Sequence, residues 1–186
     1  DGLYLSFSPR YRVNNKLSFS SSLVYQARAN NIGFAEKENI DDEYLVTFGR
    51  RDINTISNIF RTKYTFNNRM DLSLRMRHYW SEADYQEFYT LGDEGELLDS
   101  DYEENENRNY NTFNVDMVYT YAFAPASEIS IVWKNSIVRD EDILQHDYLT
   151  NLENTFASPQ SNSVSVRLLY FIDYSMLMKR IGRNHM

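Results

Sequence analysis

Few side chains in this 186-residue chain are of a type and spacing that suit catalysis. His78 and Ser81 stand three residues apart, and a histidine base beside a serine nucleophile would suit an acyl hydrolase. General acid–base chemistry of the carboxylate type would draw on polar segments that contain Asp84, Glu87, Asp140 and His146. Acidic residues in polar segments are usually only solvated, and His78 shares its strand parity with apolar residues. We therefore assign no catalytic residue and expect no enzyme activity, with a surface hydrolase kept as the alternative.

Metal-ligating patterns are also weak. Asp99, Asp101 and Glu103 alternate as in a calcium loop, but the sixth position is not glycine and the twelfth is Tyr110 instead of glutamate. The chain has no cysteine, which excludes thiolate sites and disulfides. No glycine-rich phosphate loop is present. The sequence predicts no metal site and no cofactor.

Composition narrows the class of protein. The 27 Asp and Glu exceed the 19 Lys and Arg, giving a formal net charge of −8, which argues against a nucleic-acid partner. Although 26 residues are Tyr or Phe, the mean hydropathy is only −0.60, which is unusual for a soluble domain. No apolar run approaches the length of a membrane helix, and no signal peptide is recognisable. The start at Asp1 leads us to expect a processed or truncated piece.

The dominant pattern is a strict alternation of apolar and polar residues, which predicts β-strands. Seven runs show it, at 3–13, 17–27, 56–66, 70–80, 113–123, 129–137 and 164–174. Most of these runs are about 11 residues long, close to the 9–11 residues of a tilted membrane-spanning strand. Segment 43–52 is also strand-like, and we join it to 56–66 as one long strand that pairs with an extension of 17–27 and bends at a bulge near Gly49.

Two kinds of connection separate the runs. Asparagine or proline forms short turns at 14–16, 67–69 and 125–127. Long polar connections are expected at 28–43, 81–110 and 139–162, and the stretch from Glu82 to Asn107 holds eleven acidic residues and no Lys or Arg. Short periplasmic turns opposite long extracellular loops are typical of outer-membrane barrels. The predicted fold is all-β, the C-terminal portion of a transmembrane antiparallel outer-membrane β-barrel.

An odd strand number places the two ends of the predicted sheet on opposite sides of the membrane. Single-chain bacterial barrels usually have an even number of strands. We therefore expect 1–175 to be the C-terminal strands of a larger barrel, with 176–186 as a periplasmic tail and an N-terminal part missing. A complete eight-strand barrel with one unrecognised strand is the alternative.

The alternation also predicts which side chains line the barrel. A charge that faces lipid costs about 2–4 kcal/mol at the midplane, so the basic parity must face the lumen. The predicted lumen-lining residues are Arg10, Arg12, Arg28, Arg61, Lys63, Arg75, Arg77, Lys134 and Arg167. The acidic residues predicted to oppose them on this face are Asp71, Asp116 and Asp173. Such a lumen suits an anionic plug, the passage of anions, or neutralisation by internal ion pairs.

Aromatic side chains of the opposite parity predict two girdles at the membrane surfaces. The residues concerned are Tyr64, Phe66, Tyr121, Phe123 and Tyr174 near the turns, and Trp80 and Phe113 near the loops.

Four segments, 48–52, 64–68, 77–81 and 158–170, resemble a family of outer-membrane proteins. Members of that family carry an N-terminal carbohydrate-binding-like domain of family 9 and a C-terminal barrel domain of unknown function. The resemblance covers most of the chain and implies the end of that barrel domain, with no catalytic residues to transfer.

These observations lead to a structural or transport-type component of the bacterial outer membrane, linked by the resemblance to glycan handling or to a larger envelope complex. Its expected partners are outer-membrane lipid and the missing N-terminal part of the same chain. A module that binds another envelope protein through 28–54 and 81–110 is a further alternative.

Overall fold

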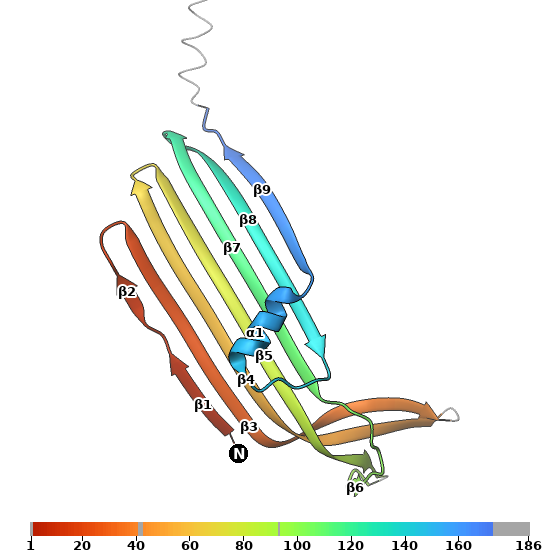
Figure 1. The fold of residues 1–186 in the computed structure, drawn as a ribbon. Coiled ribbons are helices and arrows are strands. Elements are labelled where there is room, and N and C mark those ends of the chain that lie inside the picture. Colours follow the sequence, from red (N-terminus) through yellow and green to blue (C-terminus); the bar gives the residue numbers. More distant parts are fainter. Residues whose placement is uncertain (1, 41–42, 93, 173–186) are drawn as a thin grey trace, which may run out of the picture.

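The computed structural model describes residues 2–40, 43–92 and 94–172 and shows one antiparallel sheet with a single helix on one face (Figure 1). The strands follow the chain in the order β1-β3-β4-β5-β7-β8-β9, with β2 continuing β1 along β3 and β6 added to β5. Their bounds are β1 (Gly2–Phe7), β2 (Arg10–Arg12), β3 (Leu17–Ile40), β4 (Glu43–Asn67), β5 (Met70–Leu91), β6 (Leu97–Asp99), β7 (Arg108–Ala124), β8 (Ser127–Glu141) and β9 (Gln160–Leu169), and the helix is α1 (Tyr148–Ala157). The predicted antiparallel all-β class is confirmed. Seven strands lie on the main path of the sheet, as predicted, and β2 and β6 are two short additions to it. Among the described residues the sheet is not closed, because β1 and β9 form its two edges.

The three predicted short turns are present. The Asn14 side-chain oxygen accepts hydrogen bonds from the backbone N–H groups of Lys16 (2.8 Å) and Leu17 (2.9 Å). The Asn67 side chain accepts one from Arg69 in the same way. In the third turn Ala126 has a φ of 53°. Asparagine therefore closes two of these hairpins through its side chain, as its turn preference predicts.

Strands β3 and β4 form a long hairpin, with 24 and 25 residues. The prediction that 43–52 and 56–66 form one strand is confirmed by β4. The predicted extension of 17–27 that pairs with this strand is also confirmed, because β3 continues to Ile40 along β4. The expectation of a polar connection at 28–43 is therefore wrong for most of that range. We call the outer ends of these two strands, residues 31–40 and 43–51, the arm.

The bend between the arm and the sheet lies at two irregularities of the strand pairing, a bulge in β3 and a register shift between β4 and β5 at Arg50 and Arg51, and not at Gly49 itself. Register is lost between Arg28 and Asn31, and Asn30 adopts a φ of 54°. Its backbone N–H donates to the Asp52 carboxylate at 2.8 Å. An extra residue on one strand bends the pair, and the ends of β3 and β4 swing away from the sheet direction in Figure 1. Gly49 is regularly paired with Gly33 and Phe88.

Gly49 instead makes room for a tyrosine. A Cβ at this position would collide with the ring of Tyr85, which stacks on Phe88 at 5.7 Å. The Tyr85 hydroxyl accepts a hydrogen bond from the Arg51 guanidinium. We expect Gly49→Ala to displace this ring and destabilise the arm by about 1–3 kcal/mol, the usual cost of overpacking. Limited proteolysis of the arm in the full-length protein measures the effect. The control is Gly2→Ala, whose Cβ would meet only the Ala27 carbonyl at 3.5 Å; equal cleavage of both variants would contradict the prediction.

Four further sequence expectations need correction. The connection at 81–110 is strand up to Leu91, with β6 added, so only its second part is irregular. The connection at 139–162 contains α1, which the strand alternation could not indicate. The last strand is β9, which starts earlier than 164 and ends at Leu169. The first run is interrupted between β1 and β2 at Pro9, which has no N–H to donate and is tolerated because this is an edge strand.

The sheet is a single layer and buries little apolar surface. In the described residues only Trp80, Val115 and Ile137 are buried apolar side chains. Large apolar side chains elsewhere are open, including Val164 (69 % exposed) and Leu168 (65 %) on β9. The one described helix, α1, is too short and too polar to cross a bilayer. A hydrophobic sheet face normally needs a second layer, and here α1 supplies one only over the strand ends opposite the short turns (Figure 1).

Candidate functional site

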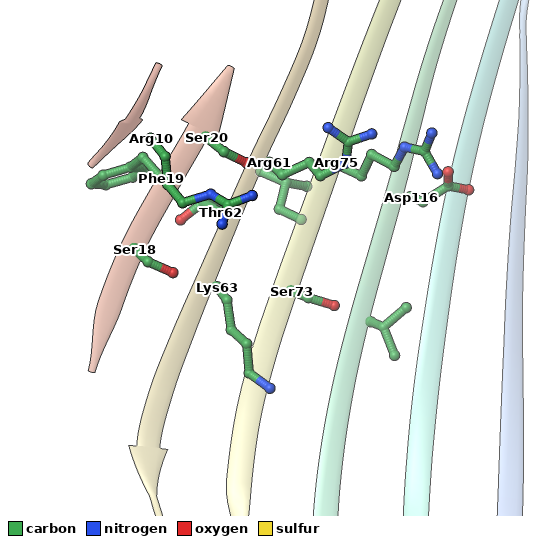
Figure 2. A pocket seen from close by; sticks show the side chains of 12 residues that line it. Arg10, Ser18, Phe19, Ser20, Arg61, Thr62, Lys63, Ser73, Arg75 and Asp116 are labelled. Carbon is green, nitrogen blue, oxygen red and sulfur yellow. The ribbon is translucent and has the colours of Figure 1, made fainter. Parts of the chain in front are cut away.

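Strand register brings three arginines into one row across the sheet. Arg10 pairs with Ser20, Ser20 with Arg61, Arg61 with Arg75, and Arg75 with Asp116. Figure 2 shows these side chains on neighbouring strands around a shallow pocket of about 510 Å³. The pocket is therefore lined by β2, β3, β4, β5 and β7, which no single sequence segment could provide.

The basic residues predicted to line a lumen all lie on this face of the sheet. The register is unbroken from Arg28 to Ser18 on β3 and from Ile53 to Thr65 on β4, so residues of one parity stay together. The nine residues are Arg10, Arg12, Arg28, Arg61, Lys63, Arg75, Arg77, Lys134 and Arg167. We call this the basic face. That it encloses a lumen stays a prediction.

Internal ion pairs neutralise only part of the basic face. Lys63 lies 3.6 Å from Asp71, and the Arg77 guanidinium donates to Asp116 at 2.8 Å. Arg167 lies 3.9 Å from Glu128, a partner that the sequence reasoning missed because it adjoins a turn. The predicted acidic neighbour Asp173 lies outside the described residues.

Arg10, Arg61 and Arg75 make no ion pair with any residue that the structure describes. The Arg75 Nε atom is buried and has no hydrogen-bond partner there. Asp116 stands opposite Arg75 in the register, but its carboxylate is occupied by Arg77. The site is thus a cationic row with spare hydrogen-bond donors.

The opposite face carries the aromatic residues, and we call it the aromatic face. Near the short turns the rings of Tyr64 and Phe66 meet edge to face at 4.7 Å, and both are about two-fifths exposed. Phe123 stacks on Tyr170 at 6.2 Å, and Tyr121 is half-buried on the same face. Tyr174 lies outside the described residues. The contact of these rings with lipid stays a prediction.

Trp80 and Phe113 have a different environment, because α1 covers them. Trp80 is 6 % exposed, and its ring lies 5.8 Å from that of Tyr148. Phe113 meets Phe156 of α1 edge to face at 4.8 Å. At this end of the sheet the helix, and not open surface, surrounds the aromatic side chains.

Helix α1 forms because its ends are capped. The Asp147 carboxylate accepts hydrogen bonds from the Thr150 backbone N–H (2.8 Å) and hydroxyl (2.6 Å), as an N-cap should. Ser158 ends the helix, and Pro159 follows it. These two signals were present in the sequence. Tyr148, Asn151 and Thr155 recur at helical spacing and face the sheet.

An asparagine cluster fixes α1 to the sheet. The Asn151 side-chain oxygen accepts hydrogen bonds from Asn109 and Asn111, both at 3.2 Å, and its amide donates to Asn111 at 2.6 Å. The Trp80 indole N–H donates to Asn109 at 2.9 Å. All three asparagines are fully buried. Asn109 and Asn111 lie on the same face of β7 as Phe113, where the alternation predicts apolar residues. Two polar residues at such positions could have indicated that another element covers this part of the sheet.

The N-cap predicts a pH dependence for α1. The hydrogen bonds from the Thr150 hydroxyl and backbone N–H hold the pKa of Asp147 below its ordinary value of 3.8. The carboxylate therefore stabilises the docked helix above pH 3.8, and this contribution is lost as the pH falls through the lowered pKa. We expect Trp80 fluorescence, recorded with Trp133→Phe, to report undocking in that acidic range. Asp147→Asn keeps an acceptor but cannot titrate, so an identical acid transition in that variant would contradict the prediction.

The residues considered for catalysis do not assemble into a site. His78 lies under α1, with Nδ1 3.1 Å from the Tyr148 hydroxyl. Ser81 lies on the basic face, where its hydroxyl is 3.2 Å from that of Thr55. The odd spacing of three along one strand sends the two side chains to opposite faces, so a serine–histidine pair cannot form here.

The carboxylates at the strand ends are engaged separately. Asp140 forms an ion pair with Arg108, whose hydrogen bonds lower the pKa of that carboxyl. Glu87 accepts hydrogen bonds from Tyr89 and Arg50, which lower its pKa likewise. His146 lies 3.4 Å from Glu82, away from these pairs. In the described part of the chain no three His, Asp or Glu side chains converge to hold a metal ion.

Together these features define a class: a meandering antiparallel sheet of long strands with one basic and one aromatic face. The chain belongs to the family described as Domain of unknown function (DUF5916), whose model matches residues 1–181. This match confirms the expected domain of unknown function. The N-terminal carbohydrate-binding-like domain and the outer-membrane location remain predictions. No curated protein and no solved structure matches the chain.

Proposed function

We propose that this chain forms part of the wall of a transmembrane β-barrel in a bacterial outer membrane, with the aromatic face against lipid and the basic face toward an aqueous interior. The role is structural and transport-type, the interior favouring anions over cations. The observation that carries the proposal is the contrast between the two faces of a single-layer sheet.

Burial supports this assignment. Outside the area under α1, the aromatic face keeps Tyr64, Ile131 and Val166 open, although a sheet with an apolar face gains stability only when that face leaves water. Lipid would cover it without a second protein layer. The basic face holds the cations that lipid would reject, each at a cost of about 2–4 kcal/mol near the midplane.

The strand directions support closure with further strands. Each of the six steps from β1 to β9 is antiparallel, so β1 and β9 run in the same direction. An antiparallel barrel would therefore need an odd number of additional strands between these two edges. A second copy would also add an odd number of strands, but inserted in the same orientation its edge strands would run parallel to β1 and β9. We therefore expect the additional strands to come from elsewhere in the full-length protein.

Site-directed labelling tests the orientation of the two faces. Because this chain has no cysteine, single cysteines can be introduced at Met117 on the aromatic face and at its neighbour Val118 on the basic face. In the full-length protein in lipid vesicles, a charged maleimide should label Val118→Cys, while a lipid-soluble probe should label Met117→Cys. Equal labelling of both by the charged reagent would overturn the proposal.

Planar-bilayer recording tests the transport part. The full-length protein should conduct, and its reversal potential in a salt gradient should indicate a preference for anions. A silent protein whose labelling pattern is nonetheless as expected would reduce the role to that of a closed scaffold.

A further inference from the structure

We propose that Arg10, Arg61 and Arg75 form a binding site for an oligoanion that carries two or more phosphate or sulfate groups. The inference deepens the proposed function, on which it rests for the location of the site in an aqueous interior. It adds a ligand class, which the barrel wall alone does not specify.

Charge in the row is unbalanced. Arg61 and Arg75 are direct cross-strand partners, and like charges placed opposite each other destabilise a sheet. Asp116 would relieve this charge, but its carboxylate is held by Arg77 at 2.8 Å. No other carboxylate among the described residues pairs with the row, so a bound anion would remove a repulsion that the fold itself leaves in place.

The spacing of the row sets the size of the ligand. Neighbouring strands lie about 4.8 Å apart, so the origins of the three side chains on β2, β4 and β5 spread over roughly 15 Å. In Figure 2 the three guanidinium groups follow one another along the row and do not converge on one point, so a single phosphate would not contact all three in this arrangement. A ligand with at least two anionic groups can bridge Arg10 on one side and the Arg61–Arg75 pair on the other, above the pocket shown in Figure 2.

The chemistry of the lining favours phosphate or sulfate. Guanidinium groups present a planar fork that donates two parallel hydrogen bonds to such oxygens. The Arg75 Nε atom is a buried donor without a partner in the described residues. The serine hydroxyls of Ser18, Ser20 and Ser73 line the same pocket and offer further donors.

Calorimetric titration of the full-length protein in neutral detergent, with inorganic tripolyphosphate as the probe, tests the site. The double variant Arg61→Gln/Arg75→Gln should bind at least about tenfold more weakly, because it loses charge-assisted hydrogen bonds. Arg167→Gln is the matched control, since Arg167 shares the basic face but pairs with Glu128 outside the pocket. Its affinity should stay within about twofold of the parent protein.

A melting-temperature measurement and one further double variant protect this test from trivial outcomes. Removing like charge should not unfold the sheet, which the melting temperature without ligand checks. Arg61→Lys/Arg75→Lys keeps the charge but loses the planar fork, so we expect it to bind with intermediate affinity. Absence of binding by the parent protein at low ionic strength, or equal weakening by Arg167→Gln, would overturn the proposal.

A competition arm identifies the source of the anion. If phosphatidylglycerol in mixed micelles with the same detergent displaces tripolyphosphate, the phosphate belongs to a lipid headgroup; if only soluble oligoanions compete, the ligand is free. The titration in detergent requires neither conductance nor vesicle labelling. Failure of the labelling test with intact binding would therefore reject the barrel orientation alone, and the reverse result would reject the anion site alone.

Discussion

Replacing Asn151 by alanine should release α1 from the sheet. Asn151 is fully buried and exchanges three hydrogen bonds with Asn109 and Asn111. Its removal leaves the amides of those two residues buried without these partners, which costs about 2–4 kcal/mol in total. The docked population should therefore fall roughly 30- to 1000-fold relative to the undocked one.

Hydrogen exchange and fluorescence measure this release. Amides of 148–157 should exchange faster, and Trp80 emission, recorded with Trp133→Phe, should shift to the red because α1 no longer covers the indole. Glu153→Ala is the control, since Glu153 is exposed on the same helix. Unchanged exchange in Asn151→Ala would mean that the ring contacts of Tyr148 and Phe156 hold the helix without the asparagine cluster.

Arginine placed at two adjacent positions of β8 should have opposite consequences. Ile131 lies on the aromatic face between Tyr119 and Val166, whereas Val132 lies on the basic face between Val118 and Ser165. If the aromatic face meets lipid, Ile131→Arg should destabilise the inserted protein by about 2–4 kcal/mol. Val132→Arg should cost much less, because its guanidinium would reach water.

The pair is compared through the unfolding free energy of the full-length protein in lipid vesicles and through the heat-dependent electrophoretic shift of folded barrels. The two substitutions add the same side chain to neighbouring β-branched positions, so strand propensity is matched. A larger loss for Val132→Arg would reverse the assignment of the two faces. Equal small losses would indicate that neither face meets hydrocarbon.

Alternation, turn residues and strand length were sufficient to predict much of the fold. The seven strands, their antiparallel order, the two asparagine turns and the continuity of β4 follow from patterns within short stretches of chain. The sharing of one face by nine basic residues follows for the same reason. Side chains of a strand alternate with a period of two, so a local pattern determines the face once the strands are paired.

Contacts between distant segments could not be predicted in this way. The glycine at position 49 suggests a bulge there, but the bulge of this hairpin lies at Asn30, whose backbone N–H donates to the Asp52 carboxylate on the opposite strand. The docking of α1 depends on Asn111 and Asn151, which lie 40 residues apart. Whether an arginine is neutralised depends on which carboxylate reaches it, and Asp116 reaches Arg77 although it stands opposite Arg75. Periodicity reports the face of each side chain, whereas its partners are determined by three-dimensional packing, so the unpaired charge of the arginine row became visible only in the folded chain.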